Sequence, residues 1–433
     1  MDTSKRDIPL EIGGNGGEMS DLYKNRNFLW LFSGQFVSQI GNSLFMIALP
    51  WFVYTQTGSK GALAITGFAQ TLPGAAALFA GVFVDRWSKR RTMIASDAAR
   101  FLLALGLFFL AIFHSSLIYI VIAVFILQLV GTFFNPAAGA LTPLVVERDL
   151  IASAMGLEQS SSATAMLLGQ IGGGTLLTAF GAPTLFWLDA FTFIVSVTSL
   201  GFVRVREPAP VRDTKSSFFS EWKDGLVQIG QSKMVLLVIA AALLSNFGFA
   251  AFDIVLTAWV KGPLHSNALG LGLSGAAFFV GMILGGLLLG TISKKVAIRQ
   301  VLLVGFILSG LFIGLIAAVP NLYWDMGTLF LAGINNGLLN GSLSAKAIEI
   351  IPEEMRGRIF GTLQAMMTLA TPLGMAVFGA LMLYLRLGAL ILLMAAISLI
   401  AGLLFLLPIR DDSENLKGGA DPSANAGGTG VSS

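Results

Sequence analysis

The chain of 433 residues contains no cysteine, two histidines and few charged residues, and each scarcity excludes a class of protein. Without cysteine there are no disulfides, no thiolate metal ligands and no thiol nucleophile. His114 and His265 are expected at loop edges, so no metal site is expected. Charged residues make up 12% of the chain, about half the usual share in soluble proteins, and hydrophobic residues make up 55%. Most of the chain is therefore expected to face lipid or other helices.

The net charge of +3 does not indicate a nucleic-acid partner, because the basic residues are spread over many short loops. The chain also lacks a glycine-rich phosphate-binding loop of the Walker type, so ATP is not expected as a direct energy source. No cofactor is expected. An enzyme is not expected either, because a buried nucleophile with its base, or a metal cluster, is missing from the pattern.

Apolar runs of spanning length recur along the chain, and a membrane-spanning helix needs about 20 apolar residues. They predict an all-α membrane protein of twelve transmembrane helices, at about 28–54, 62–84, 92–113, 117–140, 153–179, 184–204, 234–259, 268–291, 300–319, 322–345, 359–385 and 388–408.

The same pattern divides the chain into five parts. They are a disordered N-terminus (1–24), a six-helix bundle (25–204), a linker with an amphipathic helix (205–233), a second six-helix bundle (234–409) and a disordered tail (410–433).

Lysines and arginines are distributed unequally between the two sides of the predicted bundle. The loops of one side hold most of them, whereas the other side holds Lys60, Lys261 and Arg386. Because basic loops stay in the cytoplasm, we expect both termini to be cytoplasmic.

The two halves repeat one design. A shift of 205 positions pairs Gly67 with Gly272 and Gly174 with Gly379, and further pairs are Gly81 with Gly286, Asn135 with Asn340 and Gln159 with Gln364. Two pseudo-symmetric bundles predict a substrate site at their interface, near the middle of the membrane.

The stretch from Gly81 to Arg91 reads G-V-F-V-D-R-W-S-K-R-R. It resembles the signature between helices 2 and 3 of the major facilitator superfamily, G-x-x-x-D-R-x-G-R-[KR], with Ser88 in place of a glycine. The loop from Pro352 to Arg358 also resembles that superfamily. The resemblance implies the major facilitator fold, with transport by alternating access.

Further stretches resemble the bacterial drug:proton antiporter branch, which includes macrolide efflux proteins and the enterobactin exporter. They are Asp97-Ala-Ala-Arg100, Asn135-Pro136-Ala137, Leu188-Asp189-Ala190 and the helix 5 glycines Gly156, Gly169, Gly173 and Gly174. Ala165 and Gln170 depart from the antiporter motif of helix 5.

The resemblance implies a monomeric exporter of amphipathic organic molecules, driven by protons, in a bacterial inner membrane among lipids. The alternatives are a dedicated exporter of a metabolite such as a siderophore, an importer of the same fold and, in another class, a membrane-embedded lipid-handling protein.

The resemblance also implies a cytoplasmic gate. Its residues would be Gly81, Asp85, Arg86, Lys89, Arg90, Asp97, Arg100, Arg356 and Arg358. In the family, the acid at the position of Asp85 approaches the N-terminus of helix 11, where the helix dipole favours an anion. Asp85 in a surface ion pair is the alternative. Asp97 and Arg100 are expected to form a structural pair linked to Arg86 or Arg90.

Polar side chains recur at helical spacing inside several predicted spans, and each set forms one helix face. Either they form hydrogen bonds between helices or they line a wet cavity. We predict a cavity, with Gln35, Gln39, Asn42, Gln128, Asn135, Gln159, Asn246, Asn336, Asn340 and Gln364 as lining residues.

Acids within the membrane are costly and are functional candidates by default. The candidates for proton coupling are Glu158, Asp253 and Asp189. For Asp189, which lies near the outer end of helix 6, snorkelling or a helix-packing hydrogen bond is the alternative. Asn42 stands where relatives often have an acid in helix 1, which removes one proton site.

Overall fold

The computed structural model describes residues 21–207, 230, 233–292, 298–350 and 353–407, and in these residues every regular element is a helix. The first half contains α2 (Arg26–Thr57), α3 (Lys60–Thr71), η1 (Leu72–Ala76), α4 (Ala77–Arg86), α5 (Lys89–Ile112), α6 (Leu117–Gly131), α7 (Phe134–Val145), η2 (Arg148–Leu150), α8 (Ile151–Phe180) and α9 (Ala182–Phe202). The second half contains α11 (Lys233–Phe249), α12 (Phe252–Lys261), α13 (Ala268–Ile292), α14 (Ile298–Ile316), α15 (Leu322–Ile350), α16 (Glu353–Tyr384), α17 (Leu387–Leu403) and η3 (Leu404–Leu406).

Local sequence explains where several helices begin and end. The side chains of Asn25, Ser59 and Ser88 accept hydrogen bonds from the first turns of α2, α3 and α5, as N-cap residues do. Gly58 ends α2 in the left-handed conformation, with φ 60°, which glycine adopts without steric cost. In the described chain, eleven segments are long and apolar enough to cross a membrane. With α15, a helix of 29 residues, they give the predicted twelve-helix order.

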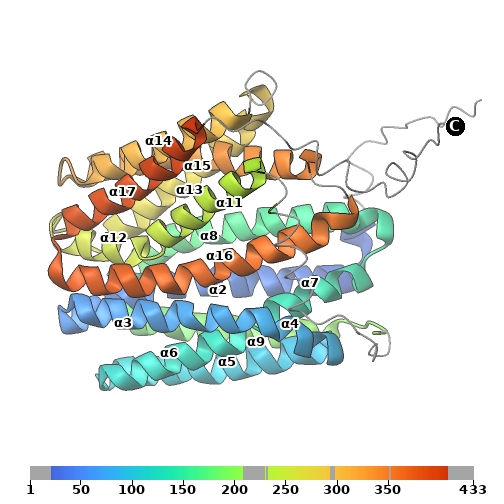
Figure 1. Cartoon of the computed structure of the whole chain (residues 1–433). Helices are drawn as coiled ribbons and strands as arrows, with labels where there is room; N and C mark the ends of the chain where they lie inside the picture. Colours follow the sequence, from blue (N-terminus) through green and yellow to red (C-terminus); the bar gives the residue numbers. More distant parts are fainter. Residues whose placement is uncertain (1–20, 208–229, 231–232, 293–297, 351–352, 408–433) are drawn as a thin grey trace, which may run out of the picture.

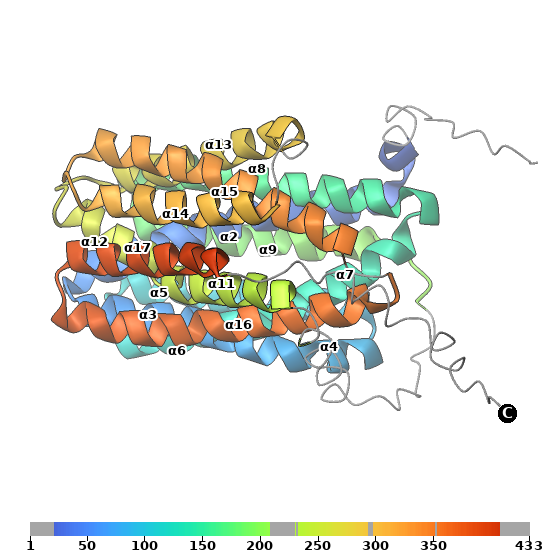
Figure 2. The same ribbon diagram turned by 45° about the horizontal axis from the view of Figure 1, so that its top comes forward.

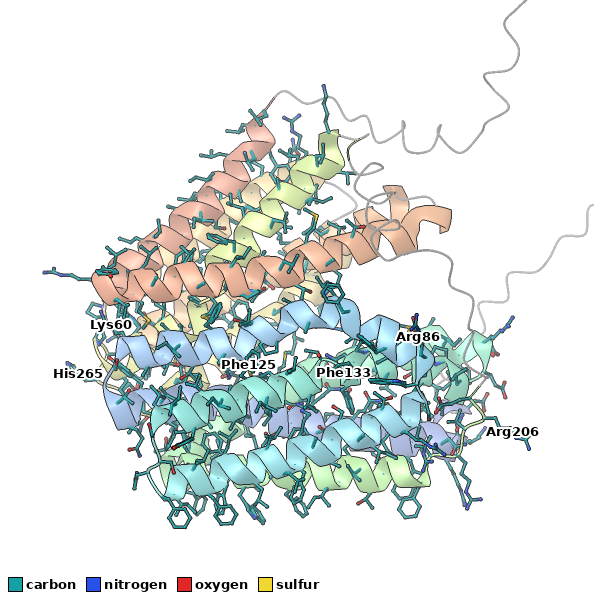
Figure 3. All side chains as sticks on the ribbon, turned by 60° about the horizontal axis from the view of Figure 1, so that its bottom comes forward. Lys60, Arg86, Phe125, Phe133, Arg206 and His265 are labelled. Atoms are coloured by element: carbon teal, nitrogen blue, oxygen red, sulfur yellow. The ribbon has the colours of Figure 1, made fainter. Side chains whose placement is uncertain are left out.

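The helices lie roughly parallel to one another and form two groups (Figures 1 and 2). In the first group α2, α5, α8 and α9 pack together, and in the second α13, α14, α15 and α17 do so. Lys60 and His265 lie at one end of the molecule, whereas Arg86 and Arg206 lie at the other (Figure 3). We call these the hairpin end and the terminal end. The amphipathic helix predicted in 205–233 and the disordered termini lie outside the described residues, apart from 21–24, 205–207, 230 and 233.

The two halves meet chiefly along two interfaces, α3 against α16 and α8 against α13. A methyl group at Gly174 of α8 would lie 2.9 Å from the Cα of Gly272 in α13. At Gly379 of α16 it would lie 3.0 Å from Ala64 of α3, and at Gly67 of α3 it would lie 2.9 Å from Met375 of α16. Gly67 and Gly272, and Gly174 and Gly379, are the glycine pairs of the 205-residue repeat. The two interfaces are therefore repeat images of each other, with small residues permitting close approach.

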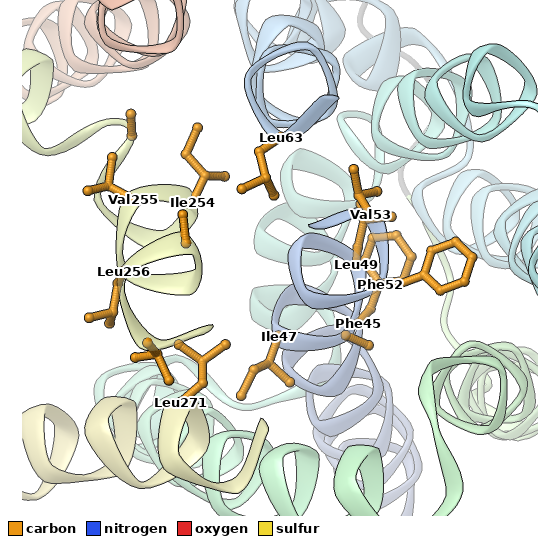
Figure 4. Close-up of a cluster of buried hydrophobic side chains, with 14 of the residues drawn as sticks. Phe45, Ile47, Leu49, Phe52, Val53, Leu63, Ile254, Val255, Leu256 and Leu271 are labelled. Atoms are coloured by element: carbon orange, nitrogen blue, oxygen red, sulfur yellow. The ribbon is translucent and has the colours of Figure 1, made fainter. Parts of the chain in front are cut away.

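A large apolar core joins the halves. In Figure 4, Ile254 of α12 lies beside Leu63 of α3, and Leu271 of α13 lies beside Ile47 of α2. At the hairpin end Lys60 donates a hydrogen bond to the carbonyl of Leu385, 3.2 Å away, and Lys261 donates one to Thr55. The halves are thus closed against each other at the hairpin end.

The terminal end is arranged differently. A methyl group added at Gly81 of α4 or at Gly361 of α16 would meet no atom of the described chain within 4 Å. The helices of the two halves diverge in this direction (Figure 3). The structure therefore has one closed and one separated end.

Two predicted spans are interrupted. The fourth breaks at Thr132 and Phe133, between α6 and α7, shortly before Pro136, which has no N–H to donate to the carbonyl four residues earlier. The seventh breaks at Ala250 and Ala251, between α11 and α12. Interrupted helices at membrane depth are tolerated where the backbone is buried in protein or lines a cavity.

Candidate functional site

A cavity of about 650 Å³ lies between the halves. The first half contributes α2 and α8, and the second contributes every helix from α11 to α16. The residues that carry most of the chemistry are Ser43, Met46, Met166, Gln170, Ser245, Asn246, Phe249, Phe252, Asp253, Thr257, Ser274, Phe278, Phe279, Asn336, Asn340 and Met367. The wall is therefore largely apolar, with amide and hydroxyl groups and one carboxylate among its described residues.

The break between α11 and α12 forms one side of the cavity. Asn246 and Phe249 precede the break, and Phe252 and Asp253 follow it. The amide of Asn246 donates to the carbonyl of Ala242, 2.9 Å away. Because the helix restarts at Phe252, Asp253 lies in the first turn of α12, where the helix dipole favours a carboxylate.

Helix α15 places its asparagines on two faces. Asn335 is buried and donates to the carbonyl of Gly305 and the hydroxyl of Ser309, at 2.8 and 2.7 Å, which fixes α15 to α14. Asn336 and Asn340 face the cavity, and the Asn340 amide donates to Asn336 Oδ1 at 2.8 Å. One face thus supports packing and the other offers polar groups to a ligand.

The ten predicted cavity residues separate into two groups. Asn246, Asn336 and Asn340 line the cavity. The residues that do not line it are Gln35, Gln39, Asn42, Gln128, Asn135, Gln159 and Gln364. Of these, Gln39 accepts a hydrogen bond from Ser162 and Asn42 accepts one from Arg100. In the first half, the polar stripe of α2 therefore serves contacts between helices, whereas its neighbour Ser43 reaches the wall.

Several wall residues were not predicted. Gln170 stands where the antiporter motif has another residue, and a methyl group at Gly275 of α13 would overlap its side chain. Gln170 thus extends from α8 toward the opposite half. Ser274, Phe278 and Phe279 lie on α13, which has no row of amide side chains at helical spacing, the pattern from which the cavity was predicted. The departure from the helix 5 motif at Gln170 is the one feature of the sequence that indicated a wall residue.

Asp325 was also missed. It is fully buried at the start of α15, and its Oδ2 accepts a hydrogen bond from the Trp259 indole of α12 at 2.8 Å. The pair joins two helices of the second half near the hairpin end. Its position next to a loop gave no signal in the sequence.

The three proton-coupling candidates occupy different surroundings. Asp253 lies on the cavity wall. Glu158 of α8 is partly exposed and accepts a hydrogen bond from the Thr142 hydroxyl of α7, 2.9 Å away. Asp189 of α9 is completely buried, and neither of its carboxylate oxygens has a hydrogen-bond partner in the described chain.

Asp97 and Arg100 form a buried pair, with Asp97 Oδ1 3.5 Å from Arg100 Nη1. Arg100 Nη2 donates to Asn42 Oδ1 of α2 at 2.5 Å, and the guanidinium carbon lies 4.2 Å from the ring centroid of Phe193 on α9. The expected link of this pair to Arg86 or Arg90 is not seen among the described residues. Arg86 is exposed, and Arg90 donates to the carbonyls of Leu200 and Gly201 at the end of α9.

The rest of the predicted gate lies at the terminal end. Asp85 and Arg86 are exposed, and Lys89 Nζ donates to the backbone carbonyl of Asp85 at 2.8 Å. The side chains of Arg356 and Arg358 lie outside the described part of the structure. The predicted contact of Asp85 with the first turn of α16 therefore stays a prediction.

Glu207 was not predicted, although it organises this loop. Its carboxylate accepts hydrogen bonds from the Ser88 hydroxyl and the backbone N–H groups of Lys89 and Arg90, at 2.8, 2.7 and 3.1 Å. Partial burial opposes ionisation, but these hydrogen bonds and the charge of Lys89 outweigh it and lower the pKa of Glu207 below its ordinary value. A residue that follows α9 thus caps the start of α5.

Relatives of known function resemble this chain along most of its length. Macrolide efflux protein A of Streptococcus pyogenes is 24% identical over 362 residues, which cover 80% of this chain and 87% of the relative. Multidrug efflux pump Tap of Mycolicibacterium fortuitum is 24% identical over 351 residues, which cover 79% and 85%.

Solved structures share the fold at low identity. The POT family transporter PepTSo matches with a TM-score of 0.72 at 12% identity, over 92% of this chain and 99% of its own. A bacterial homologue of the iron transporter ferroportin, in an inward-facing state, matches with a TM-score of 0.70 at 14% identity, over 88% and 98%. The sequence profile of the Major Facilitator Superfamily matches residues 31–264 and 238–427. This multi-pass membrane protein therefore belongs to the Major Facilitator Superfamily and is a transporter, not an enzyme.

Proposed function

We propose that the protein is a proton-coupled exporter that moves amphipathic organic molecules of the drug or macrolide type out of the cytoplasm. It works as a monomer in a bacterial inner membrane, by alternating access. The observation that carries the proposal is the cavity between the halves. Its volume of about 650 Å³ lies in the range of about 300 to 1,000 Å³ that is typical of sites for drug-sized ligands.

The chemistry of the wall favours neutral or cationic molecules over anions. Phe249, Phe278 and Phe279 offer aromatic surface, and asparagine amides offer single hydrogen bonds. Asp253 is acidic, and none of the described lining residues is a lysine or arginine. A siderophore with several anionic groups would lack a positive partner in this wall, which favours the drug-type exporter over the dedicated one.

The closed and separated ends support alternating access. The distribution of basic residues supports a cytoplasmic location for the terminal end, and in that orientation this conformation would receive substrate from the cytoplasm. Both efflux relatives carry names that agree with outward transport of drugs. For the coupling proton, Glu158, Asp253 and Asp189 stay the candidates.

The test is transport into inside-out membrane vesicles, in which an exporter concentrates its substrate. A radiolabelled macrolide and ethidium should accumulate when the vesicle interior is acidic, and a protonophore should abolish accumulation. Asn336→Leu should change the apparent affinity for at least one of them, because it replaces a polar group of the wall with an apolar one. Gln300→Ala, at an exposed residue outside the wall, is the matched control.

Other outcomes would contradict the proposal. Accumulation of a catecholate siderophore alone would identify a dedicated exporter. Uptake confined to right-side-out vesicles would identify an importer. Gradient-independent movement of labelled phospholipid, with no accumulation of the drugs, would identify a lipid-handling protein.

A further inference from the structure

Two buried acids share one buried arginine in the first half. Asp97 and Asp189 are 0% exposed and Arg100 is 7% exposed. Asp97 and Arg100 lie one turn apart on α5. Asp189 lies on α9, which packs along α5, one turn before Phe193, and the ring centroid of Phe193 lies 4.2 Å from the guanidinium carbon of Arg100. Arg100 bonds Asp97 and Asn42, and both oxygens of Asp189 and Oδ2 of Asp97 have no hydrogen-bond partner among the described residues.

The charges of this cluster do not balance when all three groups are ionised. Arginine stays protonated in proteins, so the cluster then carries two negative charges and one positive charge. An uncompensated charge buried away from water is strongly unfavourable, and the group responds by changing its protonation. One proton on either carboxylate makes the cluster neutral. Asp97 contacts the guanidinium of Arg100 directly and Asp189 interacts with it electrostatically, so the proton belongs to the pair of carboxylates.

The described neighbouring helices place no further charged side chain beside Asp97, Arg100 and Asp189. Ser96, Thr192 and Ser196 are buried polar residues of α5 and α9, and α2 contributes Asn42. The titratable groups on the helices that pack against α5 and α9 are Arg26 and Tyr54 near the ends of α2, Asp85 and Arg86 at the end of α4, Tyr119 at the start of α6 and Glu158, which is bonded to Thr142. Lys89, Arg90 and Arg91 lie in the first turn of α5 itself.

The other two coupling candidates do not share this imbalance. Asp253 lies on the cavity wall, and Glu158 is partly exposed and hydrogen-bonded. Neither of them lies beside a second acid and a shared cation: Asp253 faces the cavity, and Glu158 is bonded to a hydroxyl group. Asp189 differs, because the cation near it is the one that Asp97 also contacts.

The cluster is connected to the substrate cavity through α2. Asn42 accepts the hydrogen bond from Arg100, and the next residue, Ser43, lines the cavity. When the shared proton leaves, the single guanidinium has to serve two carboxylates, and its bond to Asn42 competes with that demand. The proton therefore alters how α5 and α9 are held against α2.

We propose that Asp97, Arg100 and Asp189 form a buried site that binds one proton between two carboxylates, and that this proton sets the position of α5 and α9 against α2. The proposal rests on the proton coupling proposed above and names its site. The step is a proton transfer from water to a carboxylate oxygen, with no other bond made or broken.

Infrared difference spectroscopy of the full chain in lipid tests the proton site directly. Spectra that compare high and low pH should show the carbonyl band of a buried protonated carboxyl, and Asp189→Asn should remove it. Asp97→Asn should remove it as well, because either variant leaves one acid for one arginine. Asp149→Asn, at an exposed acid of the same half, should leave it unchanged.

Transport by the same variants tests the coupling. In Asp189→Asn, gradient-driven accumulation of the macrolide should fall to the level of empty vesicles, whereas exchange of labelled for unlabelled macrolide should persist. If Asp189→Asn does not insert, Asp97→Asn provides the same comparison. Wild-type accumulation and an unchanged carboxyl band in both variants would overturn this proposal and leave proton-driven export intact. A band that responds as expected, without gradient-driven transport in the wild type, would instead overturn the proposed function.

Discussion

Glu207 shows how one side chain can organise a loop at the terminal end. It bonds the Ser88 hydroxyl and two backbone N–H groups in the first turn of α5, which otherwise lack partners. The same turn follows the Asp85-Arg86 pair of the predicted gate. The loop between α4 and α5 is thus fixed to a residue that follows α9.

Replacement of Glu207 by glutamine should destabilise the folded protein at neutral pH by at most about 1 kcal/mol, since capping bonds are modest and this one is partly exposed. The pKa of Glu207 is lowered in the folded state, so its contribution is present above the ordinary carboxyl pKa and is lost as the pH falls through the lowered value.

Thermal unfolding in detergent at pH 7 and pH 4 measures this difference. Glu207→Gln should unfold earlier than the wild type at pH 7, and the two should converge toward pH 4. Glu147→Gln, at an exposed acid, is the control. A difference that grows toward pH 4 would contradict the assigned role.

At the residue scale, the sequence identified polar residues inside the helices but not the residues that they contact. Asn336 and Asn340 lie on the wall of the cavity between the halves, and their contact with a substrate stays a prediction. Asn42 has the same spacing on α2, yet it bonds Arg100, because α5 approaches that face. The nearness of Asp189 to Arg100 follows from the packing of α9 on α5, which hydropathy does not encode. Whether a row of polar side chains lines a cavity or bonds another helix depends on residues that are distant in the sequence and pack against it.

Among the helix pairs, α13 and α15 approach especially closely. Methyl groups at Gly281 and Gly285 of α13 would overlap the carbonyls of Phe330 and Ile334 on α15. Those at Gly333 and Gly337 of α15 would overlap carbonyls on α13. Each helix thus carries two glycines four residues apart, a spacing that permits backbone contact in membranes.

Gly285→Ala should therefore lower the stability of the second half, because over-packing costs about 1 to 3 kcal/mol. Gly286→Ala is a matched control, since a methyl group there meets no described atom within 4 Å. Thermal unfolding of both variants in detergent measures the effect. Equal midpoints for Gly285→Ala and the wild type would show that the two helices can separate without cost.

At the element scale, hydropathy predicted the helices and their order well. It did not predict the breaks before α7 and α12, since the apolar runs continue through them. Pro136 explains the first break, whereas Ala250 and Ala251 are ordinary helix formers, so packing around the cavity has to decide the second. The positions of these helix breaks therefore could not be predicted from the periodicity of the sequence.

For the whole molecule, Asp85 should stabilise the conformation that is not seen here. It is exposed, and a methyl group at Gly81 or Gly361 would meet no described atom within 4 Å. When the terminal end closes, the carboxylate would approach the N-terminus of α16. Such a contact contributes about 0.3 to 1 kcal/mol, and up to about 2 when partly buried. That changes the ratio of two nearly equal states several-fold.

Asp85→Asn should thus favour the present conformation, with normal insertion and slower transport. A cysteine introduced at Leu343, on the cavity wall of this cysteine-free chain, reports the change. A membrane-impermeant maleimide should label it faster in inside-out vesicles when Asp85→Asn is also present. Unchanged labelling and transport would reduce Asp85 to a solvated charge, and faster labelling in right-side-out vesicles would reverse the assigned orientation.

The uneven lining of the cavity has a consequence for how such a pump diversifies. Most lining side chains belong to the second half, whereas Asp97, Arg100 and Asp189 lie in the first. If the cavity binds the substrate and the cluster binds the coupling proton, as proposed above, mutations that alter which compounds are accepted and mutations that alter proton coupling fall in different stretches of the gene. The second stretch could then vary under selection by a new compound while the first is preserved, so a lineage could change its range of substrates without losing its source of energy.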